Sequence, residues 1–429
     1  MLLRLLISHC ALGALVFVVG AHAPAAFAQS GPLTLNEAMT RAVAENPALR
    51  GSEYLLQASR ARAARAAQAP PLAVGADLED FAGTDTLSGV DSLQTTLRLS
   101  GVLELGGKRL ARVAVAERET DLAAIEQQTR RLDLLAQVAA RFAEVAARQE
   151  QLLVTRESTR LAAVTVERVA ERIRIGAAPQ YELGRAEIRL ARARIDEGNA
   201  ENELASARVR LAATWGATTA DFERVSASLF ELPKAKTFAQ IMAEIDSSPA
   251  IRLMLSRERL ADARVNLARS ARGFEIAWSA GVRHLRSIDD TALVASVTVP
   301  LGARRRAEPG MEEARALRAM APLELQAARI ETNAALFELY QELAHARLEA
   351  QTLRDQVQPQ SESVLQSTEQ AFRQGRTSFL EYANAQQQLL EVRRDAVAAA
   401  ARYHALLIEI ERLTGASLSA DDANRGEDQ

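Results

Sequence analysis

Two stretches of the chain, RIRIGAAPQYELGRAEIRL at 172–190 and AFRQGRTSFLEYANAQQQL at 371–389, carry the same landmarks in the same order, 199 residues apart. The shared positions are Gly176, Glu182, Ala186 and Leu190 in the first stretch and Gly375, Glu381, Ala385 and Leu389 in the second. Further pairs lie near this offset: Pro47 with Pro249, Gly106 with Gly302, and Gly216 with Gly415. Self-similarity at a fixed spacing indicates a duplicated architecture, so we interpret the chain as two tandem units of about 200 residues.

The two predicted units span 29–232 and 233–416. Each opens with a short helix, at 34–45 and 238–245, which a proline ends, and an Ala- and Arg-rich helix follows. The remaining residues, 417–429, are polar and acidic, and we expect them to be disordered.

The periodicity then changes from helical to two over 72–100 and 274–300. In the first segment, Leu72, Val74, Ala76 and Leu78 alternate with Ala73, Gly75, Asp77 and Glu79. Each segment predicts a hairpin of strands about 9–11 residues long, the length that crosses a bilayer as a tilted strand. A two-layer sheet of a soluble protein gives the same alternation, so this pattern alone leaves both alternatives open.

A helix of unusual length follows each hairpin. The segment 104–175 has 72 residues without proline, which predicts a helix of about 108 Å. Its apolar seam has the 3-4 spacing of a coiled coil, with Gln149 at the one polar position, and consists of Leu135, Val138, Phe142, Val145 and Leu152. The counterpart, 311–374, is expected to kink at Pro322 and Pro359. Both helices turn back at the repeated glycines and return as a hairpin.

The first 28 residues indicate export. Arg4 precedes an apolar stretch, and Ala26-Phe27-Ala28 forms a small-residue cleavage site, as in a secretory signal peptide. Cys10 follows His9 and precedes most of the apolar stretch, so it does not favour a lipoprotein. We expect a mature chain beginning at Gln29, without cysteine and without a membrane-spanning helix, so that any membrane segment must be a strand.

Composition excludes several classes of protein. The 52 basic and 55 acidic side chains give a formal charge of −3, which lacks the basic footprint of a nucleic-acid-binding protein. The three histidines after residue 28, His284, His345 and His404, are not near other ligands at metal-binding spacing. No nucleophile is spaced with a base as in a catalytic site. We therefore predict no enzyme, no metal site and no cofactor.

Four spanning strands cannot close a barrel, and an open sheet edge is not viable in lipid. Three copies supply 12 strands, an even number that encloses a water-filled lumen. The predicted fold class is thus an α+β membrane protein, with a long helical barrel and a transmembrane β-barrel closed as a homotrimer.

These features resemble the TolC-like outer-membrane efflux proteins. The local likeness is Glu104-Leu105-Gly106-Gly107-Lys108-Arg109, with Arg112 just after, which is similar to the segment after the second strand in the CzcC-type branch that serves heavy-metal cation pumps. The resemblance implies 12 strands on 12 helices in a homotrimer. It also implies a periplasmic adaptor (membrane fusion protein) and an inner-membrane RND-type pump as partners, and a place in the outer membrane.

The resemblance also implies roles for two groups of residues. The tips of the helical hairpins are implied to contact the adaptor, through Ile175, Gly176, Ala177, Gln374, Gly375 and Arg376. The implied channel entrance is at Glu381, with Glu182 at the equivalent place in the first unit. Some family members have a second carboxylate where this chain has Asn384, so the predicted ring of charge is thinner.

The connection between the first strand hairpin and the long helix can also be interpreted from its residues alone. Gly106 and Gly107 let the chain bend sharply between strand and helix. Lys108, Arg109 and Arg112 then lie near the membrane surface, where they can meet lipid head groups.

The predicted function is a passive outer-membrane conduit of a tripartite efflux system, exporting heavy-metal cations. A channel for type I protein secretion or for drug efflux remains an alternative within this class. A periplasmic coiled-coil structural or adaptor protein is the alternative from another class. An adaptor would have one helical hairpin within a β-rich domain, whereas this chain has two units with a strand hairpin each.

Overall fold

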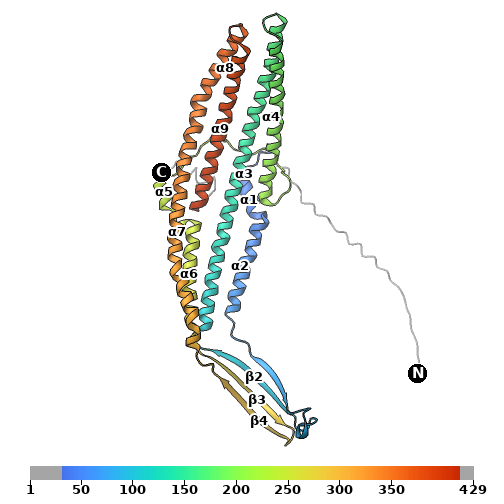
Figure 1. The fold of residues 1–429 in the computed structure, drawn as a ribbon, viewed down its shortest axis with the longest axis vertical. Coiled ribbons are helices and arrows are strands. Elements are labelled where there is room, and N and C mark those ends of the chain that lie inside the picture. Colours follow the sequence, from blue (N-terminus) through green and yellow to red (C-terminus); the bar gives the residue numbers. More distant parts are fainter. Residues whose placement is uncertain (1–30, 416–429) are drawn as a thin grey trace, which may run out of the picture.

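The computed structural model describes residues 31–415, with the predicted signal peptide and the tail 417–429 outside this range. Long helices run side by side and end on a curved sheet, which gives an elongated molecule (Figure 1). In chain order, the first half contains α1 (Leu35–Glu45), α2 (Pro47–Ala66), β1 (Ala73–Glu79), β2 (Gln94–Glu104), α3 (Lys108–Arg174) and α4 (Tyr181–Ala212). The second half contains α5 (Phe238–Ala243), α6 (Pro249–Ser270), β3 (Glu275–Leu285), β4 (Asp290–Thr298), α7 (Ala303–Thr352), α8 (Gln358–Arg373) and α9 (Phe379–Thr414). The helix–helix–strand–strand–helix–helix order thus occurs twice, if α7 and α8 together are counted as the counterpart of α3.

The four strands form one antiparallel sheet in the order β1-β2-β3-β4. The two hairpins pair with each other through β2 and β3, in a register that runs from Gln94 opposite Leu285 to Glu104 opposite Glu275. This pairing fuses the two halves of the chain into one sheet. Among the described residues, β1 and β4 each have only one neighbouring strand.

The long helix α3 has 67 residues, about 100 Å. The prediction that it begins at Glu104 is wrong, because Glu104 is the last residue of β2 and pairs with Glu275. The helix begins only after Gly106 and Gly107, which have φ values of 78° and 74°. These left-handed conformations end the strand and redirect the chain.

The counterpart of α3 differs from the expectation in two ways. It begins at Ala303 rather than at 311, and it continues through Pro322. The interruption is a π-helical segment, Leu353–Val357, immediately before α8. Pro359 follows this segment by two residues within a continuous helical backbone. Its missing N–H and its ring prevent the regular hydrogen bond to the carbonyl four residues earlier, which accounts for an interruption at this place.

The repeated glycines and prolines contact each other in the same way in both halves. Gly216 has a φ of 88°, and a Cβ there would lie 3.3 Å from Cδ of Pro47. Gly415 has a φ of 73°, and a Cβ there would lie 3.3 Å from Cδ of Pro249. The end of each returning helix therefore rests on the start of the second helix of its own half.

Four of the five residues of the seam predicted along α3 are buried, Val138 and Val145 completely, whereas Leu135 is half-buried. The one polar residue of the seam, Gln149, contacts the segment that links the two halves of the chain. Gln149 accepts a hydrogen bond from the backbone N–H of Val225 at 2.8 Å and lies 3.4 Å from the Val225 carbonyl oxygen through its amide nitrogen. A glutamine here holds the linker against the helix.

Candidate functional site

The sheet has one apolar and one polar face. The row formed by Ala76, Leu97, Val282 and Leu293 lies on one face, because these residues are paired across the strands. Its leucines are strongly exposed, Leu97 by 59% and Leu293 by 88%. Such exposed apolar rows are what a barrel strand presents to lipid.

The opposite face carries a network of charged and polar side chains. Arg98 donates to Asp77 at 3.0 Å. Arg283 donates to Thr96 at 3.0 Å and to Gln94 and Glu79 at 3.3 Å each. Both arginines thus have a carboxylate partner on a neighbouring or nearby strand, and this face is suited to water.

This polar network was not predicted from the sequence. A signal was present, because the Lys, Arg, Asp and Glu residues of β1, β2 and β3 lie at alternate positions and therefore on one face of the sheet. The pairing of β2 with β3 was needed to bring Arg283 beside Thr96 and Glu79, and these residues lie 187 and 204 positions from it in the sequence.

The far ends of the helices are two matching turns. Gly176 and Gly375 both have a φ of 73°. After each, the next residue's N–H bonds back to a carbonyl five residues earlier: Ala177 to Arg172 at 2.7 Å, and Arg376 to Ala371 at 2.9 Å. This is the hydrogen-bond pattern of a Schellman motif, in which a glycine supplies the left-handed residue.

The predicted adaptor-contacting residues share one property. All six are exposed: Ile175, Gly176, Ala177, Gln374, Gly375 and Arg376. A Cβ added at either turn glycine would meet nothing within 4 Å. The two tips therefore present free surface at the end of the molecule.

Glu381 is the third residue of α9 and belongs to a capping box. Its carboxylate accepts hydrogen bonds from the hydroxyl of Thr377 and from the N–H of Ser378, the latter at 3.1 Å, while the Ser378 hydroxyl accepts from the N–H of Glu381. These bonds, above all the one from Thr377, hold the pKa of Glu381 below its usual value. Glu381 is thus an exposed, ionised carboxylate with a structural role.

Glu182 differs from its counterpart. It lies in the first turn of α4, which has no side-chain cap at Gln180. Its Oε2 atom is buried and has no hydrogen-bond partner among the described residues. Asn384 is exposed one turn beyond Glu381, on the same side of α9 by helical spacing. The three residues predicted at the entrance therefore all lie near the tips, in different environments.

The two helical hairpins are joined just behind the tips. Arg168 of α3 donates to the hydroxyl of Tyr382 of α9 at 3.0 Å and pairs with Glu369 of α8 at 2.6 Å. Arg172 lies 4.4 Å from the ring centre of Phe372, which stacks on Tyr382. These contacts, absent from the sequence-based prediction, fix one hairpin to the other.

The connection between sheet and helices is tightly built. A Cβ on Gly106 would lie 2.9 Å from Cα of Gly273, so the two turns touch through their backbones. Lys108 pairs with Glu275 at 2.8 Å, and Arg112 pairs with Glu104. These cations are therefore neutralised within the fold.

Arg109 is the exception at this connection. It is exposed, and its side chain has no ion pair or hydrogen bond within residues 31–415. A lipid contact was predicted for Lys108, Arg109 and Arg112. Lys108 and Arg112 are held in ion pairs, so Arg109 is the one of the three that stays available.

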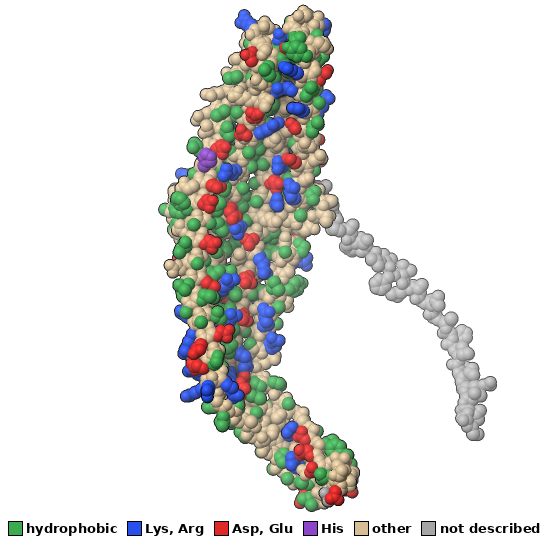
Figure 2. Space-filling view, viewed as in Figure 1, with side chains coloured by type: hydrophobic (Ala, Val, Ile, Leu, Met, Phe, Trp, Pro, Cys, Tyr) green, Lys and Arg blue, Asp and Glu red, His purple; other side chains and the backbone are tan. Residues whose placement is uncertain are grey.

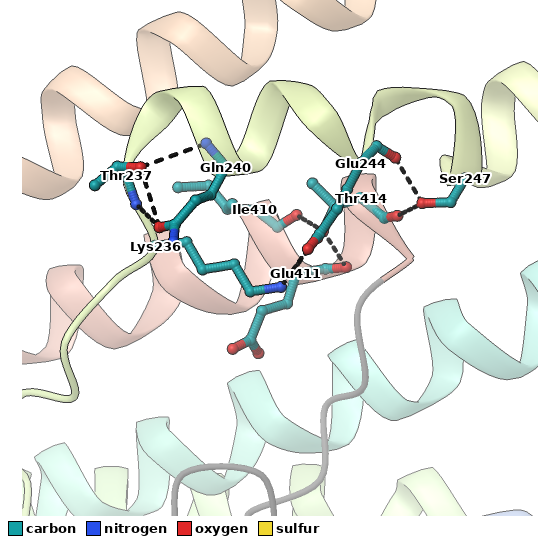
Figure 3. A network of polar contacts seen from close by, with 8 residues as sticks. All are labelled: Lys236, Thr237, Gln240, Glu244, Ser247, Ile410, Glu411 and Thr414. Carbon is teal, nitrogen blue, oxygen red and sulfur yellow. Dashed lines mark hydrogen bonds and ion pairs between the residues drawn. The ribbon is translucent and has the colours of Figure 1, made fainter. Parts of the chain in front are cut away.

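A hollow of about 760 Å³ lies halfway along the helices, between α3, α9 and the linker 227–236. Lys236 pairs there with Glu244 at 2.7 Å, while the carboxyl group of Glu411 points away from this pair (Figure 3). Burial raises the pKa of Glu411 to about 7, although the positive charge of Lys236 acts to lower it. The Nε2 atom of His404 lies 2.9 Å from the Leu229 carbonyl oxygen, so this histidine contacts the linker.

Metal-binding clusters and membrane-spanning helices are both absent from the described part of the chain. No group of three or more His, Cys, Asp or Glu side chains between residues 31 and 415 is placed to hold a metal ion. No helix in the same range combines the length and the apolar character needed to cross a membrane.

Comparisons with known proteins agree with this architecture. A family model described as outer membrane efflux protein matches residues 38–217. The chain is 26% identical to the cobalt-zinc-cadmium resistance protein CzcC of Cupriavidus metallidurans over 364 residues, 85% of each chain. It is 27% identical to the nickel-cobalt-cadmium resistance protein NccC of Alcaligenes xylosoxydans xylosoxydans over 258 residues, 60% of this chain and 58% of NccC. The solved structure of the outer membrane protein VceC of Vibrio cholerae matches with a TM-score of 0.75 and 17% identity, covering 90% of this chain and 97% of VceC, and shows the same fold.

Proposed function

We propose that the chain is a member of the outer membrane efflux protein family, and that three copies of it form a passive conduit that exports heavy-metal cations. An inner-membrane RND-type pump and a periplasmic adaptor supply the substrate, and the chain itself catalyses no reaction. The resistance to cobalt, zinc and cadmium in the name of CzcC supports the substrate class.

The observation that carries this proposal is the sheet. It has an exposed apolar face, a polar face with paired charges, and unpaired edges at β1 and β4. A sheet with these two faces fits a barrel wall between lipid and water, and its open edges require neighbouring chains. Head-to-tail contact of β1 with β4 of the next copy closes 12 strands in a trimer.

The helical part of the chain, like the sheet, has two open flanks. Contacts run from α2 and α4 to α3, then to α6 and α9, and then to α7. This order leaves α2 and α4 on one flank and α7 on the other (Figure 1). Both flanks have exposed apolar residues, among them Ile188 and Ile195 on α4 and Ile330 and Phe337 on α7. A ring of three chains covers them.

Within this assembly we assign the exposed tip residues around Gly176 and Gly375 to the adaptor contact. Glu381 forms a ring of three carboxylates at the entrance, with Asn384 beside it and Glu182 nearby. The boundaries 29–232 and 233–416 remain our proposed units, each supplying two of the four strands.

Metal tolerance of the organism that carries the chain tests this function. Deleting the gene should lower tolerance to cobalt, zinc and cadmium ions and raise their cellular content, and restoring the full chain should reverse both effects. A chain lacking 72–100, which cannot complete the barrel, is the matched control and should not restore tolerance. Unchanged metal tolerance, together with loss of a protein from the medium or with sensitivity to drugs, would establish the secretion or drug-efflux alternative instead.

A further inference from the structure

A second hollow, of about 880 Å³, lies where the helices meet the sheet. It is formed by the end of α6, the start of α7 and the turn between β2 and α3. Lys and Arg side chains gather at this junction (Figure 2). Four of the lining residues are arginines and one is acidic: Arg269, Arg272, Arg304, Arg305 and Glu308.

The positive charge of this hollow is not neutralised by the fold. Glu308 is engaged by Arg272 at 2.6 Å. Arg304 and Arg305 are exposed, and their side chains have no ion pair or hydrogen bond within the described part of the chain. The Nε atom of Arg272 is buried and also lacks a partner there. Two guanidinium groups, those of Arg304 and Arg305, thus have donors available for an anion, and Arg272 adds positive charge beside them.

The hollow opens on the apolar side of the sheet. Its wall includes Leu105 and Phe274, and the N–H of Leu105 donates to the Phe274 carbonyl oxygen at 3.1 Å. This pair directly follows Glu104 opposite Glu275, so by alternation it continues the face of Leu97 rather than the polar face. Leu105 and Phe274 are 40% and 47% exposed. An anion in the hollow therefore has an exposed apolar surface beside it.

We propose that this hollow binds the phosphate group of a lipid, with the acyl chains lying along the apolar face of the sheet. The inference rests on the proposed placement of that face in the membrane. Guanidinium groups bind phosphate oxygens through paired N–H donors, and basic pockets at a membrane surface take lipid head groups. A free phosphate offers the same anion but no apolar part for Leu105 and Phe274.

Lipid binding to the purified full-length trimer in detergent tests the proposal, with retained lipid measured by native mass spectrometry. The double variant Arg304→Gln/Arg305→Gln should bind phosphatidylglycerol about tenfold more weakly than the unmodified chain. The matched control is Arg130→Gln/Arg131→Gln, two adjacent exposed arginines in the middle of α3, and it should bind as before. Equal binding by both variants would overturn the proposal.

Two further measurements test the lipid site on the unmodified chain, so their outcome does not depend on whether the variant folds. Phosphatidylglycerol binding to the unmodified chain should weaken as salt is added, and binding unaffected by salt would count against a phosphate contact. Glycerophosphoglycerol, the head group without acyl chains, should not displace the lipid at equal concentration. Displacement would show that a soluble anion is the ligand.

The same preparations are inserted into planar bilayers to separate this proposal from the proposed function. A trimer that conducts but binds lipid equally in all variants overturns the lipid site alone. A chain that neither inserts nor conducts overturns the conduit, and with it the premise of the site.

Discussion

Glu381 has a capping role in the structure and, in the proposed function, a second role at the channel entrance that a substitution can separate from the first. Its carboxylate completes a capping box with Ser378, a place that glutamine fills equally well. In a trimer, three such carboxylates at one entrance concentrate cations and repel anions, with an effect that salt screens. Glu381→Gln should therefore lower cation preference in single-channel recordings at low salt and leave helix stability unchanged, and the two proteins should converge at high salt.

Glu37 provides a matched control for this experiment. It is the glutamate of another capping box, at the start of α1 with Thr34, far from the tips (Figure 1). Glu37→Gln removes the same charge from the same motif and should leave selectivity as it is. If Glu381→Gln has no effect at either salt concentration, Glu381 is a capping residue only.

The raised pKa of Glu411 makes the free energy of unfolding depend on pH. Its pKa rises from 4.5 to about 7 on folding, because burial disfavours the charged carboxylate. The folded state keeps the proton longer than the unfolded state, so stability is full below about pH 4.5 and falls as pH rises to about 7. Glu411→Gln should therefore stabilise the protein above about pH 7, by at most about 3 kcal/mol, and have little effect near pH 4.

Thermal unfolding followed by far-UV circular dichroism at several pH values measures this difference. Glu391→Gln, an exposed glutamate on the same helix, is the control and should give the unmodified pH profile. A constant gain in stability at every pH for Glu411→Gln would mean that packing, rather than ionisation, explains the effect.

At the scale of elements, the sequence predicted what depends on local periodicity. The alternation around Val74 indicated strands, the seam around Val138 indicated a long helix, and the repeated turn glycines indicated both hairpin ends. The fold class is confirmed in these respects. Helix boundaries were less certain, because Glu104 fits both a strand end and a first helical turn, and only pairing with Glu275 decides between them.

What the sequence could not predict depends on contacts between distant segments. The pairing of β2 with β3 brings Arg283 to Glu79, and the packing of the two hairpins brings Arg168 to Tyr382. The two prolines did not reveal which of them interrupts the helix: α7 continues through Pro322, whereas the π-helical segment Leu353–Val357 directly precedes Pro359. The positions of the two tip turns were predictable because a left-handed turn needs glycine. The cluster of arginines at the junction was not predictable, since three separate segments of the chain build it.

At the scale of the whole molecule, the open edges of the sheet predict how copies assemble. Within one chain, β1 and β4 are separated by two strands, so their backbones lie about 14 Å apart at strand spacings of about 4.8 Å. A disulfide needs Cα atoms within about 7 Å. A disulfide between a cysteine in β1 and one in β4 can therefore form only between chains.

This geometry makes the trimer testable, because residues 31–415 contain no cysteine. Ala76→Cys is combined with a cysteine at Thr291, Leu293, Ala295 or Val297, the β4 residues on the same face. Since closing a barrel shifts the strand register, one of these pairs, rather than all, should give disulfide-linked dimers and trimers on non-reducing gels. Ala76→Cys alone and Ala76→Cys with Ala280→Cys of β3 are the controls and should remain monomeric. Because an edge in lipid must be paired, the absence of linkage in all four pairs, in protein recovered from membranes, would mean that another strand closes the sheet.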